Sequence, residues 1–152
     1  MRIAVCAVGR ARAGPARALY ESYAERLRWP LELKEVAEKK AAPPAQRRAQ
    51  EGALLLRAIP ADAAVTALDE RGEMLTSAAL AARIGRWRDD GRPAAAFLIG
   101  GADGLDDSVR ARADLVLSLG RLTWPHLLVR GMLLEQIYRC QQILAGHPYH
   151  RP

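Results

Sequence analysis

The sequence predicts an α/β fold in which helices cover both faces of a mainly parallel sheet. Short apolar runs alternate along the chain with longer segments whose apolar residues recur every three or four positions, as strands and helices do in this class. The chain has 152 residues, half of them hydrophobic, which suits one domain with a sizeable core. We therefore expect a single domain spanning residues 1–152.

Five segments are predicted to be strands. Residues 3–8 form a continuous apolar run closed by Gly9, which is typical of a strand in the centre of a parallel sheet. Residues 31–36 alternate apolar and charged side chains, so we expect a half-exposed strand nearer a sheet edge. Three further apolar runs complete the set, at residues 64–68, 94–99 and 115–119.

Four helices are predicted between these strands. Residues 16–28 carry an apolar stripe, and residues 45–58 follow a proline pair that can open a helix. Thr76 or Ser77 can cap the third helix, which ends before Gly91. The fourth helix is short and covers residues 106–113.

A fifth and longer helix is predicted over residues 124–144. Thr123 is the expected N-cap and Pro125 a residue of the first turn, while Gly146 ends the helix. One apolar stripe suits the core. A second apolar side suggests contact with another neighbour, which we expect to be a second subunit, and its residues are Leu128, Met132 and Tyr138.

The formal net charge of +6 indicates an anionic partner such as nucleic acid, although charge alone does not distinguish RNA from DNA. No apolar run approaches the ~20 residues of a membrane span. The apolar segment at the N-terminus is also too short for a signal peptide. We therefore expect a cytoplasmic protein that does not enter a membrane.

Neither cysteine suggests a disulfide or a metal site. Cys6 falls in a predicted strand and Cys140 in a predicted helix, so both are expected to be small buried side chains. His147 and His150 are three residues apart, but no cysteine or acidic residue lies beside them in the sequence. We expect no metal.

Three loops are predicted to meet at the carboxyl ends of the strands, where ligands bind in parallel sheets. They are residues 69–72, 100–104 and 120–125. The glycines of the second loop have the spacing G-G-x-x-G, which matches neither the dinucleotide-binding pattern nor a P-loop. A tight strand-to-helix turn explains these glycines equally well. No serine or cysteine has the sequence setting of a catalytic nucleophile.

Three stretches resemble the SPOUT methyltransferases, in particular the small subfamily that methylates N3 of a pseudouridine in bacterial 23S ribosomal RNA. They are LDERG, FLIGGADG and the C-terminal segment that contains EQIYR and ends in HPYHR. The resemblance covers essentially the whole chain. It implies a C-terminal trefoil knot, a homodimer, and S-adenosylmethionine as the cofactor.

The resemblance also implies a cofactor site in the three loops, with contacts made mostly by backbone groups. Gly120 stands where members of the family often carry Ser or Ala, and backbone contacts would survive that change. The implied cofactor-binding residues are Leu68, Asp69, Gly101, Gly120, Arg121, Leu122, Thr123, Trp124 and Pro125.

The basic C-terminal end is the expected substrate side. A base should help to take the imide proton from N3, and His150 is the candidate for that base or for a proton relay. Arg139 and Arg151 are expected to contact phosphate or the developing ring anion, and Tyr149 to stack on or orient the base. We expect the two subunits to form the RNA groove together, with the tail or the loop at residues 10–17 coming from the second subunit.

Two alternatives remain open from the sequence. One is a non-catalytic module that binds RNA or the ribosome, with a tail that is only structural. The other is a nucleotide-binding α/β enzyme that uses the glycine loop for NAD.

Overall fold

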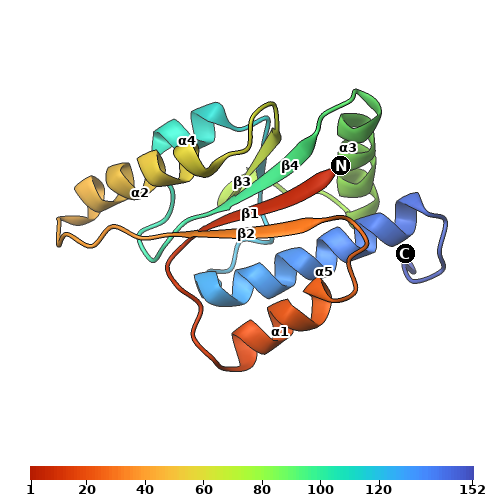
Figure 1. Cartoon of the computed structure of the whole chain (residues 1–152), viewed down its shortest axis with the longest axis horizontal. Coiled ribbons are helices and arrows are strands. Elements are labelled where there is room, and N and C mark those ends of the chain that lie inside the picture. The colour runs from red at the N-terminus through yellow and green to blue at the C-terminus, as the bar shows by residue number, and fades with distance from the viewer.

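The computed structural model describes all residues from Met1 to Pro152. Five parallel strands form one sheet in the order β2-β1-β4-β3-β5 (Figure 1). The predicted α/β fold with a parallel sheet is confirmed, with the strand at residues 31–36 on an edge. The strands are β1 (Arg2–Val8), β2 (Leu31–Val36), β3 (Ala64–Glu73), β4 (Ala94–Ile99) and β5 (Leu115–Leu117).

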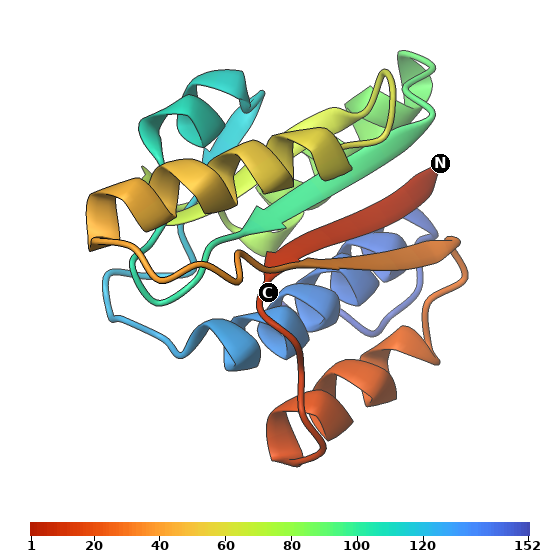
Figure 2. The same cartoon turned by 60° about the vertical axis from the view of Figure 1, so that its left-hand side comes forward.

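Helices cover both faces of the sheet, as predicted (Figures 1 and 2). Helices α2 and α4 lie on one face, and α1, α3 and α5 on the other. The trefoil knot stays a prediction about the path of the chain. The helices are α1 (Pro15–Ala24), α2 (Pro44–Ala58), α3 (Ser77–Asp89), α4 (Asp107–Arg112) and α5 (His126–Leu144).

The core has two parts because the sheet is buried on both sides. In β1, Ile3 and Val5 pack toward α3 and α5, while Cys6 packs toward α2 and α4. The central strand β4 is buried at every position, which explains its continuous apolar sequence. Burying one large aliphatic side chain contributes about 1.5–3 kcal/mol, so α5 is held firmly by its fully buried Leu133, Leu134 and Ile137.

Both cysteines are buried, as predicted. Cys6 and Cys140 are free thiols with no exposed surface. Burial raises the pKa of Cys6 to about 11 and that of Cys140 to about 12. Both side chains are therefore neutral core residues near neutral pH.

The start of α5 differs from the prediction. The helix begins at His126 with Pro125 as the N-cap residue, and no side chain caps it. Thr123 instead donates a hydrogen bond through Oγ1 to Glu70 Oε2 at 3.4 Å. The reason is Pro125, since a residue that precedes proline is driven out of helical geometry, and Trp124 therefore cannot begin the helix.

Helix α1 is shorter than predicted and ends at Ala24. The chain beyond it is held by Gln141 of α5, whose Oε1 accepts hydrogen bonds from the backbone N–H groups of Arg28 and Trp29 at 2.9 and 3.1 Å. This contact joins residues more than 100 positions apart, so no local pattern could show it.

The end of the third strand also differs from the predicted turn. β3 extends to Glu73, and its pairing with β5 is interrupted so that both Leu68 and Glu73 lie opposite Leu117. The residues between them leave the ladder. Gly72 must be glycine, because a Cβ atom there would lie 2.6 Å from the backbone of Val116. Conversely, β5 ends at Leu117 rather than at residue 119.

None of the helices combines the length and the hydropathy that a membrane-crossing segment requires. No group of three or more His, Cys, Asp or Glu side chains is arranged to share a metal ion.

Candidate active site

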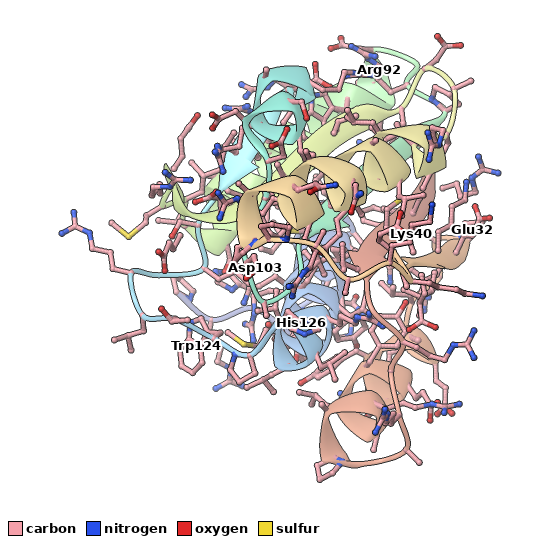
Figure 3. The ribbon with its side chains drawn as sticks, turned by 90° about the vertical axis from the view of Figure 1, so that its left-hand side faces the viewer. Glu32, Lys40, Arg92, Asp103, Trp124 and His126 are labelled. Atoms are coloured by element: carbon pink, nitrogen blue, oxygen red, sulfur yellow. The ribbon has the colours of Figure 1, made fainter.

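The three predicted loops surround one open cleft of about 1020 Å³ at the carboxyl ends of the strands. Figure 3 looks onto this end of the molecule and shows Asp103, Trp124 and His126 there. The cleft brings together all but one of the residues predicted to bind the cofactor, and Arg121 is the exception. Those that line it are Leu68, Asp69, Gly101, Gly120, Leu122, Thr123, Trp124 and Pro125.

The glycine loop after β4 lies directly against the layer beneath it. A Cβ atom at Gly101 would approach Glu51 Oε2 of α2 to 2.8 Å and Val8 Cγ1 of β1 to 3.0 Å. The loop closes through a hydrogen bond of 3.0 Å from Gly104 N–H to the carbonyl of Gly101. Gly104 has a φ of +81°, which side-chain-bearing residues rarely adopt. The glycines therefore let the backbone itself form this wall of the cleft.

The loop between β5 and α5 presents unpaired backbone donors. Ser118 fixes its start, because its Oγ donates to the carbonyl of Gly120 at 3.0 Å and accepts from Gly120 N–H at 3.1 Å. None of the backbone N–H groups of residues 121–124 donates a hydrogen bond within the chain. Leu122 and Trp124 are 70% and 39% exposed, which is unusual for large apolar side chains. This loop can therefore bind a ligand through both backbone and apolar contacts.

Asp69 is held by two arginines at the third side of the cleft. Its carboxylate accepts hydrogen bonds from the backbone N–H of Arg71 at 2.9 Å and from Arg110 Nη1 at 2.9 Å. Arg110 also donates to the carbonyl of Leu105 at 2.9 Å, which joins the end of β3 to the glycine loop. Burial alone would raise the pKa of Asp69, but the hydrogen bonds from Arg71 and Arg110 outweigh it and lower the pKa.

Asp69→Asn is expected to lower the free energy of unfolding by about 1–3 kcal/mol at pH 7, because it weakens hydrogen bonds to charged groups. The pKa of Asp69 in the folded protein lies below its ordinary 3.8, so this contribution is complete above that pH and is lost as the pH falls through the folded-state value. Urea unfolding from pH 7 to pH 3 should show the difference between the two proteins shrinking. A difference that does not change with pH would contradict this account of Asp69. Asp89→Asn, at a 68% exposed side chain, is the matched control.

Several residues that line the cleft were not among those predicted from the sequence. Arg48 belongs to α2, which lies on the face of the sheet opposite to α5, and only the tertiary structure brings it to the cleft. Ile99 could have been found, since it ends a predicted strand directly before the glycine loop.

His126 also lines the cleft and could have been found, because it directly follows the last predicted loop. Burial, together with the nearby charge of Arg130, lowers the pKa of His126. Its imidazole is therefore neutral at pH 7. Its Nδ1 is buried and has no hydrogen-bond partner.

The predicted substrate residues form a second group, which we call the tail cluster: Glu135, Arg139, Tyr149 and His150. Glu135 Oε1 accepts hydrogen bonds from Arg139 Nε at 3.0 Å and from the Tyr149 hydroxyl at 3.2 Å. The Arg139 guanidinium lies 4.8 Å from the centre of the Tyr149 ring. Burial and the charge of Glu135 raise the pKa of Tyr149 to about 12, so its hydroxyl stays protonated at neutral pH. Arg151 follows this cluster and is exposed.

His150 Nδ1 lies 3.3 Å from Arg139 Nη1. Because an arginine can only donate, Nδ1 accepts this contact, and the proton of the neutral ring is on Nε2. In this arrangement the free edge of His150 is a hydrogen-bond donor.

The structure does not bring the tail cluster and the cleft together within one chain. In Figure 1 the start of α5 lies at the left and the C-terminus at the right. His126 at the cleft and Arg139 in the cluster are separated by about 20 Å along α5, since a helix rises ~1.5 Å per residue. No residue from 139 onward lines the cleft.

The matches to known proteins extend over essentially the whole chain. A family model described as "Predicted SPOUT methyltransferase" matches residues 1–150. The chain is 60% identical over 151 residues to the ribosomal RNA large subunit methyltransferase H of Rhodospirillum centenum, covering 99% of each chain. It is 53% identical over 152 residues to the protein of the same name from Paramagnetospirillum magneticum, covering 100% of each chain. The resemblance found in the sequence is thus confirmed, and the chain belongs to the SPOUT methyltransferase family.

Proposed function

We propose that this protein transfers a methyl group from S-adenosylmethionine to N3 of a pseudouridine in 23S ribosomal RNA. Methyl transfer follows from the family, and the relatives named above are methyltransferases of large-subunit ribosomal RNA. The observation that carries the proposal is the cleft, in which three loops present backbone groups at the carboxyl ends of parallel strands. A ribosomal substrate also makes the cytoplasm the proposed location.

The cleft fits S-adenosylmethionine. Its volume of about 1020 Å³ is at the upper end of the range for small-molecule sites. The free N–H groups of residues 121–124 suit the polar atoms of a nucleoside and an amino acid. Ile99, Leu117 and Leu119 supply an apolar surface for an aromatic base. When bound, S-adenosylmethionine supplies an electrophilic methyl group, and the protein has to position it.

The residues of this chain then have to prepare N3 as the nucleophile. The N3–H bond would break, its proton would pass to a base, and the electron pair left on nitrogen would form the new bond to the methyl carbon. The carbon–sulfur bond of the bound cofactor would break at the same time, and its electron pair would leave with the sulfur of S-adenosylhomocysteine. Arg139 and Arg151 can stabilise the developing charge on the ring, and Tyr149 can orient the base. His150 can accept the proton only after Arg139 releases its Nδ1 or the ring changes tautomer, because its free edge now carries a proton.

We propose that the protein acts as a homodimer in which the tail cluster of one subunit faces the cleft of the other. The separation of about 20 Å along α5 prevents Arg139 from reaching its own cleft, because an arginine side chain is much shorter. Leu128 and Met132 on the second apolar side of α5 are only half-buried in the isolated chain and suit such a contact. No separate RNA-binding domain is needed if both subunits contribute to one groove.

A mixed dimer tests this shared site. Gly101→Val should disable the cleft, because the added side chain collides with Val8, while Arg139→Ala disables the tail cluster. In a heterodimer that carries one change in each subunit, the intact cleft faces the intact tail, so about one working site per dimer is expected. Dual-tagged purification followed by a methylation assay measures it. A heterodimer with no activity would contradict sharing between subunits.

The function itself is tested by mapping the methyl groups of ribosomal RNA, by mass spectrometry, from cells with and without the protein. Loss of one methyl group on a pseudouridine, restored by the purified protein, is the expected result. Calorimetry with S-adenosylmethionine and with NAD distinguishes the alternatives. Binding of S-adenosylmethionine alone supports the proposal, binding of NAD alone supports a dinucleotide enzyme, and ribosome binding without methylation supports a non-catalytic module.

A further inference from the structure

Arg130 of α5 is almost completely buried, with 2% of its side chain exposed, and it lies outside the predicted site. Its Nη1 donates to Glu35 Oε2 of β2 at 2.6 Å. Its Nη2 donates to the backbone carbonyls of Val8 and Gly9 at 3.2 and 2.9 Å. One guanidinium thus joins α5, β2 and the carboxyl end of β1.

The segment held in this way is residues 9–14, which we call the arginine loop. Gly9 N–H donates to the carbonyl of Val36 at 2.8 Å, and Ala11 N–H donates to Glu35 Oε2 at 2.6 Å. Glu35 Oε2 therefore accepts from both Arg130 and the loop. The rest of the loop is mostly exposed, so these contacts at its start fix its position.

The arginine loop starts at the wall of the cleft. Val8 lies beneath Gly101, whose Cβ would be 3.0 Å from Val8 Cγ1. A Cβ at Gly9 would be 3.4 Å from the ring of His126. Gly101 and His126 both line the cleft, so the loop leaves the sheet directly beside it.

Two unpaired positive charges lie on this loop. Arg10 and Arg12 are exposed, and neither lies within 4.0 Å of a carboxylate oxygen, although the charge of Arg10 contributes to the lowered pKa of Glu35. Arg17, just beyond the loop, differs because its Nε lies 2.8 Å from Glu21. Exposed arginines without a carboxylate partner are suited to phosphate groups of RNA, which they can bind with two parallel hydrogen bonds.

We infer that Arg130 and Glu35 are positioning residues that hold the arginine loop beside the cleft, so that Arg10 and Arg12 bind the phosphate backbone of the RNA substrate. This inference rests on the proposed function and adds a substrate contact to the same site. Neither Arg130 nor Glu35 touches the substrate in this arrangement. They act through the backbone of Gly9 and Ala11.

The test uses three forms of the full-length protein: Glu35→Gln, the double variant Arg10→Ala/Arg12→Ala, and the triple variant. Glu35 is changed to Gln because the amide oxygen can still accept a hydrogen bond from Arg130, so the nearly buried guanidinium keeps a polar partner while the charge of the carboxylate is lost. Affinity for large ribosomal subunits is measured by filter binding, together with kcat and KM for methylation. Calorimetry with S-adenosylmethionine and the melting temperature check the cleft and the fold.

The double variant Arg10→Ala/Arg12→Ala should bind large ribosomal subunits about tenfold more weakly, or more, at low salt. The loss of two phosphate contacts should also reduce the slope of log affinity against log salt concentration by roughly 1–2. KM should rise while kcat and cofactor affinity stay within about twofold. Glu35→Gln should weaken binding several-fold in the wild-type background and have no further effect in the double variant, because the two changes act on one contact. Arg88→Ala removes an exposed arginine on α3 and serves as the control for charge.

The inference is overturned if Glu35→Gln leaves binding unchanged, or if it weakens binding equally in both backgrounds. The latter result would indicate a general effect on the fold. A wild-type protein that binds ribosomal subunits through the arginine loop but methylates nothing would refute the proposed activity and keep the inference. Failure of the double variant to dimerise, seen by sedimentation, would assign the loop to the subunit contact and also overturn the inference.

Discussion

Arg139→Ala is expected to slow methylation of ribosomal RNA by about 10²–10³-fold, the usual effect of removing one donor that stabilises developing charge. Arg139 also contacts Glu135, the Tyr149 ring and His150, so its loss removes a contact from two other candidate groups, Tyr149 and His150. The affinity of the dimeric Arg139→Ala variant for S-adenosylmethionine should equal that of the wild-type protein, because Arg139 does not line the cleft. Single-turnover methylation and calorimetry provide the two measurements.

Two control variants sharpen this experiment. Arg88→Ala removes an exposed arginine of α3 whose ion pair is with the neighbouring Asp89, away from the tail cluster, and should change the rate less than about twofold. Arg139→Lys keeps the charge but loses the planar group, so an intermediate rate is expected. If Arg139→Ala lowered the affinity for S-adenosylmethionine as much as it lowered the methylation rate, the division of roles between the cleft and the tail cluster would be contradicted. If His150→Ala and Arg151→Ala both keep full methylation, the role proposed for the tail is wrong.

Arg130→Met is expected to lower the free energy of unfolding by about 1–3 kcal/mol, the usual cost of leaving buried hydrogen-bond acceptors without a charged donor. The change leaves Glu35 and the carbonyls of Val8 and Gly9 without their charged donor. Burial raises the pKa of Glu35, but the hydrogen bond from Arg130 and that from Ala11 N–H outweigh it and lower the pKa. Arg130 is thus one of the groups that favour the ionised carboxylate in the wild-type protein, and urea unfolding at pH 7 measures the stability lost without it.

The double variant Arg130→Met/Glu35→Gln distinguishes the contribution of the two charges to stability from that of side-chain packing. Removing both charges should recover part of the lost stability, because Glu35 is then no longer a half-buried carboxylate that has lost its guanidinium partner. Arg17→Ala is the matched control, since its ion pair with Glu21 is about half exposed and contributes at most about 1 kcal/mol. A loss below about 1 kcal/mol in Arg130→Met would show that the buried contact contributes little to folding.

The sequence predicted the sheet and the cleft because their signals are local. The apolar run of β4 and the glycines after it are adjacent in the chain, and parallel strands bring their carboxyl ends to one edge. The predictions failed where a neighbour or a distant residue decided the geometry. Pro125 moved the start of α5, and Gln141 held the chain after a shortened α1. Residues 69–72 were predicted as a turn that ends the third strand. In the structure they interrupt the pairing of β3 with β5, and Gly72 lies close to the backbone of Val116 there.

The candidate site was predictable in parts but not as a whole. The loops and the basic tail could each be recognised from their residues. The position of Tyr149 and His150 could not, because it depends on how the tail returns along α5 to Glu135. Arg48 and Arg130 were also missed, since each reaches its position through contacts between elements that are far apart in the sequence.

The loop between β5 and α5 combines free backbone donors with the exposed side chains of Leu122 and Trp124. A ligand that fixes this backbone also fixes the apolar surface that the same residues present outward. If a second subunit packs on that surface, ligand affinity and dimer affinity are linked, and each must raise the other by the same factor. Dilution of the dimer would then weaken cofactor binding although no residue of the cleft is altered.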